Sequence, residues 1–183
     1  METTTTIEDT LPIIYISGLL IFLVGLTIFV ILQIIKTRRN ENNFNKLQKK
    51  LQKDKGNAQE YYELGSMYLD KKLYVQAVNL LQKSQKMAED EKIDQENKAL
   101  ICNALGFAYY GQEQLDLAMR HYKEAIKLYP GYVIALNNLA SAYERKQMTV
   151  KALETYQESL KYQPTNAVAK RRAESLSKRV VET

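Results

Sequence analysis

The pattern of apolar and polar positions divides the chain into an uncharged apolar run near the N-terminus and a longer segment with helical periodicity. No charged residue occurs from position 12 to position 35, in a run that reads PIIYISGLLIFLVGLTIFVILQII. A helix that rises about 1.5 Å per residue crosses a hydrocarbon core of about 30 Å within this length. A cleaved signal peptide is disfavoured, because the preceding residues are acidic and the apolar run is too long. We therefore expect a short tail over 1–11 and a retained transmembrane helix over 12–35.

A basic segment follows the apolar run and predicts its orientation. Eight basic and two acidic residues lie between positions 36 and 55, beginning with Lys36, Arg38 and Arg39, and no basic residue precedes the run. The positive-inside rule therefore places the rest of the chain in the cytoplasm, or in the stroma of a plastid. We interpret 36–56 as a partly helical juxtamembrane linker. Its cations act as a topology signal alone, or they also hold the linker against anionic lipid of the bilayer.

Beyond position 56, apolar residues recur at helical spacing in three stretches that can be laid on one another. Each stretch has a leucine and a small residue, then a tyrosine and later an alanine, beginning at Leu64, Leu105 and Leu139. The second and third leucines are 34 residues apart, whereas the first and second are 41 apart. Such a 34-residue period is typical of the tetratricopeptide repeat (TPR), a pair of antiparallel helices. We therefore predict an all-α chain with a three-repeat TPR α-solenoid, its repeats at 57–90, 99–132 and 133–166.

Two further segments complete the expected solenoid. Seven additional residues separate the first two repeats and fall in an acidic stretch that we assign to 91–98. This insertion is either an elongated second helix followed by a loop or a longer entry into the next helix, and the sequence leaves both open. After the third repeat, Asn166 is suited to cap a last helix. A thin apolar stripe and a polar outer face predict a C-terminal capping helix and tail over 167–183.

The first helices of the repeats are expected to line a concave binding face, as in other helical solenoids. Register between the repeats assigns eleven residues to this face: Tyr62, Ser66, Leu69, Leu100, Asn103, Phe107, Tyr110, Ile134, Asn137, Ser141 and Glu144. Aromatic and aliphatic side chains supply contact area, and the amides of Asn103 and Asn137 are placed to bond the main chain of a bound peptide. The alternative is that several of these residues pack against the neighbouring repeat or the last helix.

Some TPR domains clamp acidic C-terminal peptides with cations at fixed positions of this face. The corresponding positions in this sequence are Tyr62, Ser66, Ala104, Ile134 and Asn138. Because none of these side chains is a cation, we do not expect that class of ligand.

The chemistry of the remaining residues argues against an enzyme. The chain has no P-loop motif, one cysteine (Cys102) and one histidine (His121), so we expect no catalysis, cofactor, metal or small-molecule substrate. We expect Cys102 to be a small buried side chain and His121 to be exposed or partly buried. The net charge is +5, but the basic excess lies in 36–55 and 161–183, which leaves the repeats slightly acidic. Nucleic acid is therefore not an expected partner.

One N-terminal span, a basic linker and three repeats with the motifs LGSMYL, LGFAYY and LASAYE resemble a specific family. The arrangement is similar to the small TPR photosystem I assembly proteins of cyanobacteria and red-algal type plastids. This resemblance implies a thylakoid membrane protein whose TPR domain faces the stroma or cytoplasm. It also implies a scaffold that binds photosystem I subunits or assembly intermediates. The residues themselves leave open a membrane-anchored TPR adaptor or receptor in protein import, export or organelle division.

Overall fold

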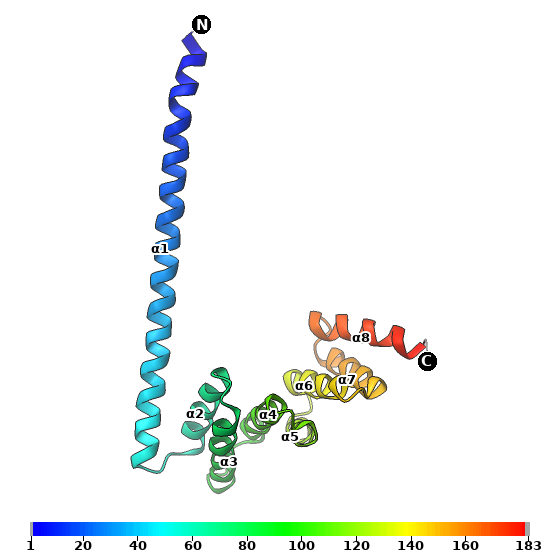
Figure 1. Cartoon of the computed structure of the whole chain (residues 1–183). Helices are drawn as coiled ribbons and strands as arrows, with labels where there is room; N and C mark the ends of the chain where they lie inside the picture. Colours follow the sequence, from blue (N-terminus) through cyan, green and yellow to red (C-terminus); the bar gives the residue numbers. More distant parts are fainter. Residues whose placement is uncertain (1, 182–183) are drawn as a thin grey trace. The chain divides into compact units, whose positions relative to one another are not determined.

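The computed structural model describes residues 2–181, which form eight α-helices and contain no strand (Figure 1). The chain divides into two compact units, one up to Lys46 and one from Leu47 onward. The expected all-α class is confirmed. The helices are α1 (Glu2–Lys53), α2 (Ala58–Asp70), α3 (Tyr74–Asp90), α4 (Gln95–Gly111), α5 (Leu115–Leu128), α6 (Val133–Arg145), α7 (Thr149–Tyr162) and α8 (Ala167–Val181).

Helix α1 is longer than the apolar run from which it was expected. It continues without a break through the basic segment to Lys53, so only residues 54–57 separate it from α2. Its apolar part has a mean hydropathy of 2.8, and none of that window is buried by the described residues. A helix whose apolar side chains are exposed on all sides is stable in an apolar solvent such as the bilayer core. A helix also satisfies its own backbone hydrogen bonds there. Helix α1 is therefore a candidate membrane span.

The last turns of α1 pack on the first repeat. Gln48 Nε2 donates a hydrogen bond of 2.8 Å to the hydroxyl of Tyr68, and Lys50 forms an ion pair with Glu60. Glu60 also completes a capping box with Asn57 at the start of α2. The Lys50 ammonium and the backbone N–H of Asn57 lower the pKa of Glu60. The basic linker thus ends as part of the folded solenoid.

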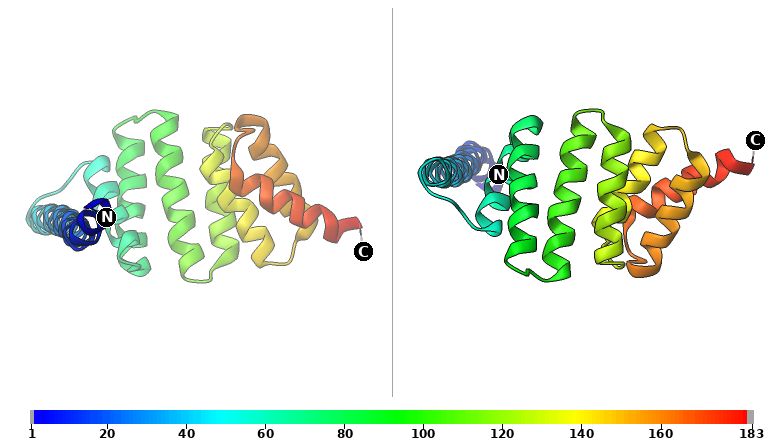
Figure 2. Two further views of the ribbon diagram at one scale, coloured as in Figure 1. Left: turned by 90° about the horizontal axis from the view of Figure 1, so that it is seen from above. Right: turned by 90° about the horizontal axis from the view of Figure 1, so that it is seen from below.

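Helices α2 to α7 form three antiparallel pairs stacked in sequence, as the repeat pattern predicts (Figure 2). Glycine allows the helices of the first two pairs to approach closely. A Cβ atom at Gly65 would lie 2.9 Å from Leu81, and one at Gly106 would lie 2.6 Å from the ring of Tyr122. These distances are shorter than real Cβ contacts, so the leucine–small-residue element of the motif has a direct steric cause.

Each first helix ends in a left-handed residue that is not glycine. Lys72, Glu113 and Gln147 have φ angles of 59°, 63° and 59°. The next residue donates its N–H five positions back, for example Met148 to the Tyr143 carbonyl at 2.9 Å. This bond is the Schellman arrangement, which satisfies carbonyls at the end of a helix and reverses the chain within three residues.

The insertion lengthens the helices on both sides of it. Helices α3 and α4 each have 17 residues, whereas the other four repeat helices have 13 or 14. Both sequence interpretations therefore hold in part. The carboxylate of Glu91 accepts the N–H of Ala58 at 3.2 and 3.3 Å, and Ile93 packs on the core of the first repeat. The insertion thus caps the N-terminus of α2.

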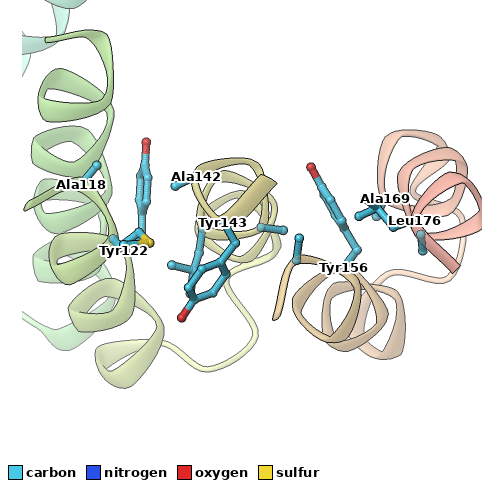
Figure 3. Close-up of a cluster of buried hydrophobic side chains, with 12 residues drawn as sticks. Ala118, Tyr122, Ala142, Tyr143, Tyr156, Ala169 and Leu176 are labelled. Carbon is cyan, nitrogen blue, oxygen red and sulfur yellow. The ribbon is translucent and has the colours of Figure 1, made fainter. Parts of the chain in front are cut away.

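A continuous core joins the second and third repeats to the last helix. Tyr122, Tyr143 and Tyr156 succeed one another along it, and small alanines separate them (Figure 3). Asn166 Oδ1 accepts the N–H of Ala169 at 3.0 Å, so the expected cap of α8 is confirmed. Ala169 and Leu176 are buried against the rest of this core. Helix α8 therefore closes the stack, as expected of a capping helix.

Candidate binding groove

The eleven residues predicted for the binding face all belong to the first helices of the repeats, α2, α4 and α6. Within the second unit, α2, α4 and α6 lie along one side, and α3 and α5 lie along the other (Figure 1). We call the side of α2, α4 and α6 to which these eleven residues were assigned the groove. Nine of them are partly buried, whereas Phe107 is 43% exposed and Ile134 is 57% exposed. These two side chains are the apolar groups of the groove that are most available to a partner.

A hollow of about 50 Å³ lies between α2 and α4. Tyr62 and Leu100 from the predicted set form part of its wall, and Ile93 from the insertion forms another part. Ile93 was not among the residues predicted for the groove, although an isolated apolar residue in an acidic stretch was an available signal. The lining combines aromatic and aliphatic side chains with the amides of Gln59 and Asn97.

Amide side chains link α4 to α6 in the middle of the groove. Asn138 Nδ2 donates to Asn103 Oδ1 at 3.0 Å, and Asn103 Nδ2 donates to the hydroxyl of Tyr132 at 3.4 Å. Asn137, which was expected to face a peptide, instead accepts a bond of 2.8 Å from the buried Ser159 hydroxyl. An amide has two donors and two acceptor sites, so Asn103 and Asn138 keep capacity for a ligand.

Tyr110 is held in place from two directions. Its hydroxyl lies 3.3 Å from Ser141 Oγ, and the guanidinium of Arg145 lies 5.2 Å from the centre of its ring. Arg145 also bonds Glu113 at 2.6 Å. The contacts with Ser141 and Arg145 restrain the partly buried ring of Tyr110.

Glu144 is engaged within the protein. It accepts a hydrogen bond of 2.8 Å from the hydroxyl of Tyr156, and its other oxygen lies 3.6 Å from Arg172 Nη1 of α8. Burial, followed by the hydrogen bond to Glu144, raises the pKa of Tyr156, so the phenol stays protonated and donates. The negative charge of Glu144 is therefore directed toward α7 and α8.

The remaining predicted groove positions lie on α2. Ser66 and Leu69 are both partly buried, and Leu69 packs on the core of the first repeat. Leu69 therefore agrees with the alternative interpretation, in which some of the predicted groove residues pack inside the solenoid.

The lone histidine and the lone cysteine are both buried. His121 is 8% exposed, which differs from the expected exposed or partly buried site, and its ring stacks on Tyr109 with centroids 5.3 Å apart. Burial lowers the pKa of His121, and it raises the pKa of Cys102 to about 12 with the help of Glu124 and Glu89. Near neutral pH Cys102 is therefore a protonated thiol, and His121 is a neutral imidazole enclosed by neighbouring side chains. No cluster of three potential metal ligands occurs among the residues whose side chains the structure describes.

The membrane-flank cations lie on α1. Lys36, Arg38 and Arg39 are exposed and follow the apolar part of the helix within one turn. Their position along a continuous helix matches cations at the edge of a membrane span. Contact with anionic lipid remains a prediction.

Comparison with known proteins follows the same repeats. Two tetratricopeptide repeat models match residues 57–131 and 121–154. A Cyanophora paradoxa protein named ycf37 is 34% identical over 158 residues, covering 86% of this chain and 90% of that protein. The Arabidopsis thaliana protein PYG7, described as chloroplastic and TPR-containing, is 36% identical over 164 residues, covering 88% of this chain. The chain spans only 53% of PYG7.

Solved structures share the fold at lower identity. The crystal structure of MamA superposes with a TM-score of 0.68 and 23% identity, covering 78% of this chain and 81% of MamA. At 23% identity this similarity shows only that the two proteins share the TPR solenoid fold.

Proposed function

Because the chain belongs to the ycf37 family of tetratricopeptide repeat proteins, we propose that it is a membrane-anchored scaffold that assists the assembly or stabilisation of photosystem I. In this role the groove binds exposed segments of photosystem I subunits or assembly intermediates. We place the protein in the thylakoid membrane as a single-pass protein, with the TPR domain in the stroma or cytoplasm. The chloroplastic Arabidopsis relative and the apolar part of α1 support this location.

The observation that carries the proposal is the exposure of Phe107 and Ile134 on the groove. Both remain open on a surface whose neighbouring alanines and leucines are buried, and Asn103 and Asn138 lie beside them. Burial of apolar area contributes about 25 cal/mol per Å², and a few anchor side chains supply most of the affinity of an interface. A partner segment that covers these two residues gains this energy and finds hydrogen-bonding groups for its main chain.

The membrane anchor allows the groove to bind its partner even if its affinity in solution is modest. A binding module confined near its target by a short tether experiences an effective concentration on the order of millimolar. Unassembled membrane subunits are confined to the same bilayer. A contact that is weak in solution therefore becomes effective at the membrane surface.

Affinity capture from detergent-solubilised membranes tests the proposal. The wild-type chain should copurify with photosystem I subunits from thylakoid fractions, and the double variant Phe107→Ala/Ile134→Ala should lose most of this capture. The matched control is Val75→Ala/Val150→Ala, which removes side chains that are 61% and 53% exposed on second helices. Unchanged capture by a folded groove variant would refute groove binding. A different result would favour an adaptor or receptor of another pathway: the protein is found in an envelope membrane with another partner, and loss of its gene leaves the photosystem I level unchanged.

A further inference from the structure

Helix α8 has the residue pattern of the first helix of a fourth repeat. Residues of α6 and α8 that are 34 positions apart have the same burial where the helix faces the preceding repeat: Ala135, Leu139 and Ala142 correspond to Ala169, Ala173 and Leu176, and all six are buried. The positions that face a helix's own partner differ. Leu136 and Ala140 are buried in α6, whereas Lys170 and Glu174 are exposed in α8, where no second helix follows among the described residues.

The same register carries the groove onto α8. The groove residues of α6 correspond to four exposed residues of α8, namely Val168, Arg171, Ser175 and Lys178. Val168 is 52% exposed, close to the 57% of its counterpart Ile134. The contact of Arg172 with Glu144 at 3.6 Å joins the groove side of α8 to the groove side of α6. The bond between Asn138 and Asn103 makes the equivalent connection between α6 and α4.

The α8 end of the groove is basic. Among the described residues, no carboxylate lies within ion-pair distance of Arg171 or Lys178. Arg172 balances the charge of Glu144, and Glu174 is the one carboxylate of α8 itself, so Arg171 and Lys178 together leave this end of the groove with a net positive charge. The groove therefore changes along its length from apolar and amide side chains on α4 and α6 to cations on α8.

We propose that α8 extends the groove and that Arg171 and Lys178 bind acidic side chains next to the apolar residues of the partner segment. This inference rests on the proposed function and defines the kind of segment that the groove takes. The side chains of Glu144 on α6 and Arg172 on α8 meet at 3.6 Å, and an extended chain advances about 3.3 Å per residue. An acidic residue about three positions from the apolar residue that covers Ile134 therefore reaches α8.

A protein segment fits this surface better than a lipid headgroup does. The cations continue a surface that already holds Phe107, Ile134 and the two amides, and a single extended segment satisfies all of them. An anionic lipid headgroup would contact only the cations and would leave the adjoining apolar and amide side chains without a partner.

Fluorescence anisotropy with the full chain in neutral detergent micelles tests the inference. The probes are two labelled peptides, one with leucines next to aspartates and one with asparagine in place of each aspartate. The wild-type chain should bind the aspartate peptide about fivefold more tightly than the asparagine peptide, and added salt should reduce the difference. Arg171→Gln/Lys178→Gln should abolish the difference and keep binding of the asparagine peptide. The matched control Lys86→Gln/Lys151→Gln removes two exposed charges from second helices and should change neither affinity.

The outcomes separate this inference from the groove proposal. Equal affinity of the wild-type chain for both peptides would overturn the role of α8 and leave the groove proposal intact. If the wild-type chain prefers the aspartate peptide and Phe107→Ala/Ile134→Ala loses binding to both peptides, the groove proposal and the role of α8 are both supported. If phosphatidylglycerol nanodiscs abolish the preference and zwitterionic nanodiscs do not, α8 serves lipid headgroups and the inference is overturned.

Discussion

The side-chain amide of Asn138 donates a hydrogen bond of 3.0 Å to the side-chain oxygen of Asn103, and this bond links the first helices of the second and third repeats. Both residues are partly buried, so each amide loses water when the repeats pack. The bond therefore stabilises the stack and orders the polar part of the groove.

Replacement of either asparagine should expose this coupling. We expect Asn103→Ala and Asn138→Ala each to lower the free energy of unfolding by about 1 kcal/mol, because each leaves the other amide without its partner. The double variant should cost less than the sum of the two, by about 0.5–1 kcal/mol. Urea denaturation of the four proteins in detergent, followed by circular dichroism, gives the cycle. Strict additivity would show that the bond contributes nothing to stability.

Two glycines should respond differently to alanine. A Cβ at Gly106 meets the ring of Tyr122 at 2.6 Å, and Tyr122 is only 1% exposed, so the ring has no space to move. We expect Gly106→Ala to cost about 1–3 kcal/mol through overpacking. Gly131→Ala is the matched control, because its Cβ meets atoms at 3.4 and 3.7 Å, which is ordinary contact. Its effect should stay within about 0.5 kcal/mol by the same denaturation measurement. Equal effects would contradict the close approach at Gly106.

The left-handed residue at the end of α6 offers a stabilising change. Gln147 has a φ angle of 59°, a conformation that costs a residue with a side chain about 1 kcal/mol and costs glycine nothing. Gln147→Gly should therefore raise the melting temperature. Gln157→Gly, at an exposed position inside α7, should lower it, because glycine is about 1 kcal/mol less favourable than alanine in a helix interior. A loss of stability in Gln147→Gly would contradict the turn geometry.

Buried His121 should make stability depend on pH. Burial lowers its pKa below the ordinary value of 6.5, Glu124 opposes this shift, and Arg120 adds to it. Between the folded and unfolded pKa values the unfolded chain binds more protons, so stability falls as pH drops below about 6.5 and levels off below the folded pKa. His121→Phe should remove this part of the pH dependence. The urea midpoints of wild type and His121→Phe are measured from pH 7.5 to pH 5. If the midpoints of the two proteins fall equally with pH, a neutral buried imidazole is contradicted.

Much of this fold follows from spacing in the sequence. The period of 34 residues and the small residue after each leucine locate the repeats, since the steric requirement at Gly65 and Gly106 is local and strict. The cap at Asn166 is equally local. The reversals at Lys72, Glu113 and Gln147 carry no such signal, because backbone hydrogen bonds of the Schellman type hold these residues in a left-handed conformation that their side chains do not prefer.

The groove could be predicted only in outline from the sequence. Register identifies the face, but the rotation of each helix decides whether Asn137 or the adjacent Asn138 meets Asn103. Ile93 joins the hollow because Glu91 fastens the insertion to α2, a contact between segments 33 positions apart. Such long-range contacts are not encoded in local periodicity. The polar outer face of α8 indicated a cap, whereas its groove register emerged from its burial pattern beside α6.

Site-specific photocrosslinking in intact thylakoid membranes tests whether the groove binds photosystem I subunits. A photoreactive side chain placed at Phe107, in the groove, is compared with the same group at Val75, which is 61% exposed on a second helix. We expect an adduct with a photosystem I subunit from position 107 and none from position 75. Adducts of equal yield from both positions, or an adduct from position 107 only with proteins outside photosystem I, would contradict it.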